Sequence, residues 1–193
     1  MAEINVQVEA NYDDAKERPD DPYFANSVTG IEVEWSGTAS AVTHAGTRFT
    51  VTIPVGATID SAHAHIYIHS SNDDMHGDIF GHDVETSQDF NDDQTIFSRT
   101  RTTASVAWDE EELTNSAWAQ SPELKTIIQE LVDSYDHSGG RALTLLWIAH
   151  GDLVKIADWY AHNYSAGEMA TKLDIVYTVG AAAFKGSRGF IIG

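Results

Sequence analysis

The sequence predicts an all-β protein, an antiparallel β-sandwich of the jelly-roll kind with one short helix. Most of the chain alternates apolar and polar residues with a period of two, which is typical of strands that bury one face. Polar, turn-rich gaps separate these segments, as in sandwiches and barrels and unlike folds in which strands alternate with helices. A single segment has the apolar spacing of a helix.

The alternating segments predict about nine strands. In chain order they are Ile4–Val8, Ile31–Trp35, Phe49–Ile53, Ile59–His69, Asp78–Glu85, Thr102–Trp108, Ala142–His150, Val154–Tyr160 and Thr171–Thr178. In the fourth strand the small and aliphatic residues should face the core and the histidines should face outward. The strand Ala142–His150 has apolar side chains on both faces, so we expect it to be central and covered on both sides.

The helix is expected over residues 122–134. Ser121 suits the N-cap position and Pro122 the first helical position. The apolar residues then recur at helical spacing, and Gly139 and Gly140 follow the helix. We expect this helix to close one mouth of the sandwich. The polar segment Asp13–Asn26 is expected to be a loop.

The length of 193 residues favours one domain, which we place over residues 1–178. Residues 179–193 follow as an arm too rich in glycine to build a core of its own. We expect the arm to be extended and to contact another subunit. Its contacting residues would be Phe184, Lys185, Arg188, Phe190, Ile191 and Ile192.

The charge balance excludes several function classes. The chain has 11 Lys and Arg residues against 30 Asp and Glu residues, a net charge of −19. Nucleic-acid binding needs clustered cations, so we expect no nucleic-acid partner, and the same charge argues against anionic membranes.

No cysteine is present, which excludes thiol chemistry and cysteine-based zinc sites. We also expect no secretory signal and no membrane span.

Several phrases together resemble a known family. They are QVEANYDDAKE, GTRFTVTIPVGATIDSAHAHIYI, TASVAWDEEEL, SPELKTIIQELVDS, SGGRALTLLWI and TKLDIVYT. Over roughly residues 4–178 the chain looks like the DNRLRE-type jelly-roll module, which is similar to a carbohydrate-binding module. The resemblance implies a binding or architectural role in surface adhesins or tailed-phage structural proteins, with no catalytic machinery.

From this resemblance, the missing signal and the arm, we expect a non-enzymatic structural protein of a tailed-phage virion. It would be a capsid decoration, fibre or tail component, made in the host cytoplasm and contacting other virion proteins or copies of itself. The first alternative is a stand-alone module that binds a cell-surface glycan. Trp118 in a polar loop, and the cluster of Tyr160, His162, Asn163 and Tyr164, are the glycan-binding candidates, because sugars pack on exposed aromatic rings flanked by polar groups. Packing or a protein interface is the competing interpretation of these aromatic residues.

The second alternative is a metal-dependent enzyme centred on His63 and His65. These residues and His69 share one face of a strand, and such a pair can chelate a transition metal. The acidic residues Asp13, Asp14, Asp73 and Asp74 are candidates for Ca²⁺, which prefers oxygen ligands on loops. Solvated polar surface is the favoured interpretation of both groups, so we expect no cofactor, and no residue is assigned a catalytic role.

Overall fold

The computed structural model describes residues 1–18, 23–26, 28–35, 42–70, 74–91, 95–110, 112–150 and 155–180. Its strands join into one antiparallel sheet, so the prediction of an all-β, sandwich-like fold is confirmed. The strands are β1 Ala2–Gln7, β2 Asp14–Arg18, β3 Tyr23–Ala25, β4 Gly30–Trp35, β5 Val42–Val51, β6 Ala57–Ser70, β7 Met75–His82, β8 Arg101–Glu110, β9 Trp118–Gln120, β10 Arg141–Ala149, β11 Lys155–Tyr160 and β12 Lys172–Val179. The helices are α1 Lys125–Ser134 and the 3₁₀ turn η2 Ser165–Gly167.

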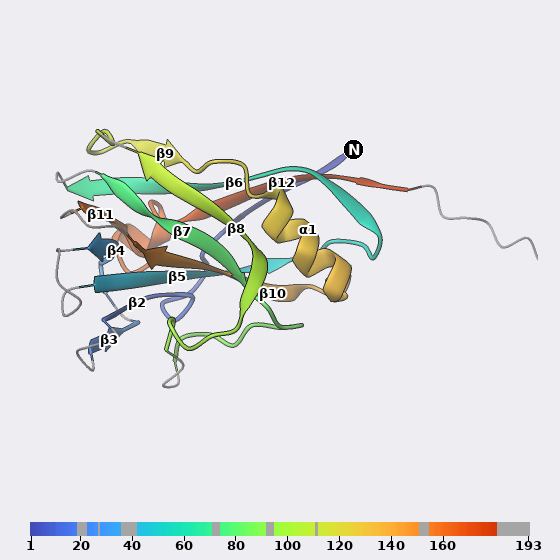
Figure 1. The fold of residues 1–193 in the computed structure, drawn as a ribbon, viewed down its shortest axis with the longest axis horizontal. Helices are drawn as coiled ribbons and strands as arrows, with labels where there is room; N and C mark the ends of the chain where they lie inside the picture. The colour runs from blue at the N-terminus through green and yellow to red at the C-terminus, as the bar shows by residue number, and fades with distance from the viewer. Residues whose placement is uncertain are drawn as a thin grey trace, which may run out of the picture.

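The sheet curls over on itself around one main core. Its strand order is β1-β12-β6-β11-β4-β5-β10-β7-β8, with β2 paired to β3 and β5, and β9 paired to β6. Figure 1 shows β6 and β12 running along one side of the molecule and β5 and β10 along the other. Apolar residues from both sides meet in one cluster, which gives the two packed layers of a sandwich.

Strand β6 has the predicted alternation. Ala62, Ala64, Ile66 and Ile68 are buried, whereas His63 and His65 are half-buried and His69 is exposed. The register with β12 places Leu173 opposite Ala64 and Ile175 opposite Ala62, so that the buried residues of the two strands meet on the same face. A shift of one residue would turn every one of these side chains to solvent, which fixes the register.

Strand β10 is covered on both faces, as its sequence predicts. Leu143, Leu145 and Trp147 belong to the main core. On the opposite face Leu146 and Ile148 join a second, smaller cluster whose other members come from β2 and from residues before β8: Ala15, Phe90 and Ile96. Gly46 in β5 leaves room for the Phe90 ring, which a Cβ at this position would meet.

The prediction of a loop from Asp13 to Asn26 is wrong, because this segment contains β2 and β3. Strand β2 pairs with β5 and carries the buried carboxylates Asp14 and Glu17. Alternation of apolar and polar residues cannot reveal a strand whose buried side chains are themselves acidic. Strand β9, three residues long, was also missed because it is too short to show a period.

The helix begins later than predicted. Its N-cap is Leu124, without a side-chain hydrogen bond, and Pro122 is not helical. Ser121 instead pairs with β6: its N–H donates to Ala64 O and its hydroxyl accepts from Ala64 N at 2.9 Å. This strand-like pairing keeps the backbone extended where a cap was predicted.

The predicted apolar face of α1 is confirmed, since Leu124, Ile127, Ile128 and Leu131 are buried. The helix contacts β6, β7 and β8, and so covers the opening between β6 and the edge strand β8 (Figure 1). Within the described ranges, no helix is long and apolar enough to cross a membrane.

Candidate functional site

An aromatic strip crosses the outer face of the sheet. We define it as Trp118, Tyr67, Tyr160 and Tyr164. Strand pairing places Trp118 of β9 opposite Tyr67 of β6, and β11, which ends at Tyr160, pairs with β6 on its other edge. The neighbours Ile66, Ile68 and Trp159 in β6 and β11 point into the core, so the alternating tyrosines point outward.

The rings of the strip are in contact from end to end. The ring centroids are 5.3 Å apart for Tyr67 and Trp118, 6.0 Å for Tyr67 and Tyr160, and 3.7 Å for Tyr160 and Tyr164. The ammonium of Lys172 lies 4.0 Å from the centroid of the Trp118 ring. A hydrogen bond with Tyr164 raises the pKa of the Tyr160 hydroxyl above its ordinary value.

A pocket of about 510 Å³ adjoins Tyr160 and Tyr164. Its polar wall includes Lys16, His69 and Asp158. His69 Nδ1 lies 3.0 Å from Asp158 Oδ2, and Lys16 Nζ lies 3.1 Å from Glu32 Oε1. The pocket therefore combines an aromatic surface with a carboxylate, an imidazole and an ammonium group, which can both donate and accept hydrogen bonds.

Three of the five predicted glycan-binding residues belong to this site. Trp118, Tyr160 and Tyr164 lie in the strip, whereas neither His162 nor Asn163 lines the pocket. His162 fixes a turn: its N–H donates to Asp14 Oδ2 at 2.7 Å, and its ring packs against Gly167, whose φ is +83°.

The sequence interpretation missed Tyr67, His69 and Asp158 as members of this site. The outward positions of Tyr67 and His69 follow from the alternation in β6. Only strand pairing reveals that they lie beside Tyr160 and Asp158 of β11.

The predicted metal ligands on β6 do not converge. His63 Nδ1 lies 3.1 Å from Ser121 O, His65 Nε2 lies 2.9 Å from Asp174, and His69 pairs with Asp158. Each histidine thus contacts a different segment. In the described part of the chain, the one group of three metal-ligating side chains that lies close together is His76, Asp109 and His150, a set that the sequence did not bring together.

Among the described residues, the acidic Ca²⁺ candidates do not form a group of converging metal ligands. Asp13 is buried and pairs with Arg48, and Asp14 is buried in β2. Asp74 accepts a hydrogen bond from the N–H of Glu112 at 3.0 Å. Asp73 lies outside the described residues, as do the arm residues 181–193 with the predicted contacts Phe184, Lys185, Arg188, Phe190, Ile191 and Ile192.

No family model matches the chain, and no curated protein shows significant sequence similarity to it. The resemblance to the DNRLRE-type module therefore stays a prediction.

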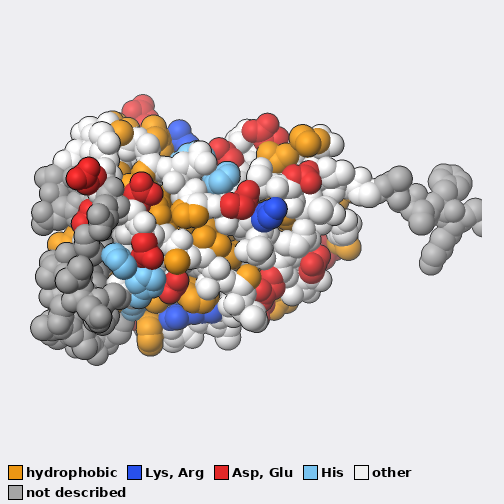
Figure 2. Space-filling model, turned by 45° about the horizontal axis from the view of Figure 1, so that its top comes forward, with side chains coloured by type: hydrophobic (Ala, Val, Ile, Leu, Met, Phe, Trp, Pro, Cys, Tyr) orange, Lys and Arg blue, Asp and Glu red, His pale blue; other side chains and the backbone are white. Residues whose placement is uncertain are grey.

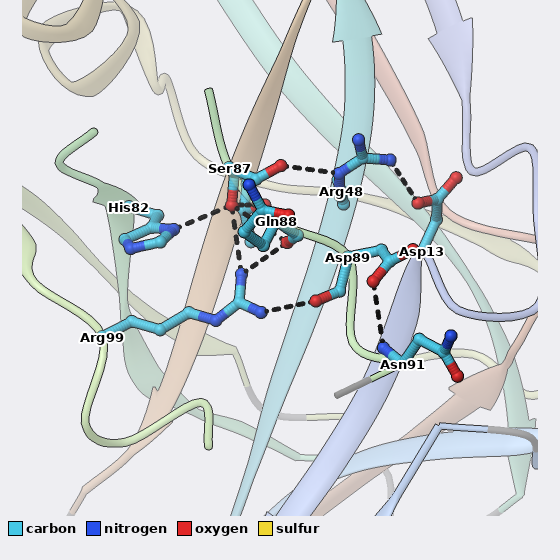
Figure 3. A network of polar contacts seen from close by, with 9 residues as sticks. Asp13, Arg48, His82, Ser87, Gln88, Asp89, Asn91 and Arg99 are labelled. Carbon is cyan, nitrogen blue, oxygen red and sulfur yellow. Dashed lines mark hydrogen bonds and ion pairs between the residues drawn. The ribbon is translucent and has the colours of Figure 1, made fainter. Parts of the chain in front are cut away.

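A buried serine–histidine pair joins the end of β7 to the segment between β7 and β8 (Figure 3). Ser87 Oγ is 2.7 Å from His82 Nδ1 and also contacts Arg99 Nη1 and Thr144 Oγ1. A serine beside a histidine can be a nucleophile, but Ser87 is 1% exposed and its oxygen is enclosed by these partners. We interpret the network as a structural link that holds this segment against β5 and β10.

Asp14 is the described carboxylate with the most unusual environment. It is fully buried, and burial raises its pKa to about 7 although the His162 N–H stabilises its charged form. The charge of Asp13 raises this pKa further. Its Oδ2 ties β2 to the turn that carries His162 and Tyr164, so Asp14 supports the segment that ends the aromatic strip.

Proposed function

We propose that the chain is a non-enzymatic binding module that holds a carbohydrate on the aromatic strip and in the adjoining pocket. One observation carries the proposal: segments distant in the sequence place four contacting aromatic side chains on the outer face, beside polar groups that line a pocket. Sugar rings present C–H groups that pack on aromatic faces and hydroxyls that need directed polar partners.

The charges of the chain favour a neutral sugar. Acidic side chains are spread over the face drawn in Figure 2, with fewer basic ones among them, and the net charge is −19. An anionic polymer would be repelled by this field. The ammonium of Lys16 in the pocket is already paired with Glu32, so it is suited to donating a hydrogen bond rather than to binding an anion.

The size of the pocket agrees with a small ligand. Its volume of about 510 Å³ lies within the range of about 300–1,000 Å³ that is usual for small-molecule sites. The strip extends beyond the pocket to Trp118, so an oligosaccharide could contact both. A structural role in a phage virion stays a prediction from the sequence, and sugar binding by this surface is compatible with it.

Alanine at Tyr160 is expected to weaken sugar binding at least about tenfold. A lost ring contact removes on the order of 1.4 kcal/mol, which corresponds to tenfold in affinity. Tyr160→Phe keeps the ring and should bind more tightly than Tyr160→Ala. The measurement is a glycan array with the purified chain, followed by titration of the strongest neutral ligand.

Phe97→Ala is the matched control, because Phe97 is an exposed aromatic residue that belongs to neither the strip nor the pocket. It should bind like the unchanged chain. The proposal fails if the array shows no binding, or if binding is the same in Tyr160→Ala and in the unchanged chain.

A further inference from the structure

Three adjacent strands bring a histidine–aspartate cluster together, which we define as His76, Asp109 and His150. Strand β7 pairs with β8 so that His76 lies opposite Asp109. On its other edge β7 pairs with β10, and the N–H of His150 continues this pairing by donating to His76 O at 3.3 Å. The three residues thus form one row across the sheet, at cross-strand spacing.

The side chains of this row face away from the core. In β7 the residues Met75 and Ile79 are buried in the core, and the alternation turns His76 and Asp78 to the opposite face. The side chains of His76, Asp109 and His150 are 32%, 50% and 33% exposed. The row is accessible from solvent and can therefore take up an ion.

The ligand atoms have the spacing of a metal site. Asp109 Oδ1 is 2.9 Å from His76 Nδ1 and 3.0 Å from His150 Nε2, and the three ligand atoms all lie within 4.8 Å of one another. Around a tetrahedral zinc ion with bonds of about 2.0–2.1 Å, neighbouring ligand atoms are about 3.3 Å apart. Small side-chain adjustments would suffice to hold an ion.

Asp78 orients one of these ligands. His150 Nδ1 lies 2.9 Å from Asp78 Oδ2 and can donate its proton there, and Nε2 lies 3.0 Å from Asp109 Oδ1, so a bound metal ion would replace the Nε2 proton between these two atoms. A carboxylate behind a histidine is the usual outer partner of a zinc ligand. His76 Nδ1 is buried and close to Asp109, yet within the described residues it has no partner in hydrogen-bond geometry.

We propose that His76 Nδ1, His150 Nε2 and Asp109 Oδ1 bind a divalent transition metal, for which Zn²⁺ is the best match, with Asp78 as the outer partner of His150. Two imidazoles select such an ion against Ca²⁺ and Mg²⁺, which prefer oxygen ligands. The ion joins the residue that follows β10 to β7 and the edge strand β8, and solvent completes its coordination. This site lies on other strands than the aromatic strip and is independent of the proposed sugar binding.

The test uses the full chain, purified and dialysed against a chelator, and titrated with ZnCl₂ in a calorimeter. We expect one Zn²⁺ per chain and a higher melting temperature with the ion bound. His76→Gln and Asp109→Asn should each weaken binding more than tenfold. Asp78→Asn should weaken it about 10–100-fold, as the loss of an outer carboxylate usually does.

The double variant His63→Gln/His65→Gln is the matched control, because it removes two half-exposed histidines of β6 that lie outside the cluster. It should bind Zn²⁺ like the unchanged chain, and excess Ca²⁺ should not compete.

Circular dichroism with chelator present verifies that each variant is folded. A Co²⁺ absorption spectrum gives a second readout, which His150→Gln should alter. The proposal is overturned if no Zn²⁺ binds, if His76→Gln and Asp109→Asn bind normally, or if the control variant loses the ion.

Discussion

Replacing Trp147 with alanine is expected to lower the free energy of unfolding by about 3–5 kcal/mol, since a large buried ring leaves a cavity that the surrounding residues cannot fill. Trp147 is 1% exposed in the central strand β10. Its ring centroid lies 6.0 Å from that of Trp108 and 5.5 Å from that of Trp159. Its Nε1 also donates to Thr47 Oγ1 at 2.9 Å, so the substitution leaves a buried hydroxyl without this partner.

Urea unfolding followed by circular dichroism measures this effect. Trp118→Ala is the control, because it removes the same side chain from a position that is 39% exposed and should cost less than about 1 kcal/mol. Equal midpoints for the Trp147 and Trp118 variants would show that the three tryptophan rings do not form the centre of the core.

Between pH 4 and pH 8, Asp14→Asn is expected to reduce the change in the free energy of unfolding by about 3–4 kcal/mol. In the folded chain the pKa of Asp14 is about 7, against 3.8 as the ordinary value. Between these values the folded state keeps a proton that the unfolded chain has released. The folded state therefore binds more protons, and stability falls as the pH rises through this window. Above pH 7 Asp14 is charged in both the folded and the unfolded chain, and the full cost of burying this charge lowers the free energy of unfolding.

The measurement compares urea midpoints of Asp14→Asn and the unchanged chain across this pH range. Asp13→Asn is the control at the adjacent position. It breaks the ion pair with Arg48, so it should destabilise the chain at neutral pH. The Asp13 charge is the smallest of the three contributions to the Asp14 pKa, so this variant should keep most of the slope. Parallel pH profiles for Asp14→Asn and the unchanged chain would contradict the assignment of a raised pKa to Asp14.

The sequence alone determined most of the strands and the face that each one buries. The alternation in β6 and the two apolar faces of β10 depend only on side chains a few residues apart, because successive side chains of a strand point in opposite directions. The same rule failed for β2, whose buried positions Asp14 and Glu17 are acidic. The preference of serine for helix caps misplaced the start of α1, where pairing of Ser121 with β6 replaced a helix cap.

The tertiary structure alone decided which outward-facing residues meet. Tyr67 is outward by its place in β6, but the pairing of β6 with β9 and β11 brings Trp118 and Tyr160 to it. His76, Asp109 and His150 likewise become neighbours through the register of β7 with β8 and β10. Alternation within a strand fixes which face a residue occupies, whereas its neighbours on that face depend on strand order and register. Those are set by packing of the whole core, which no local pattern records.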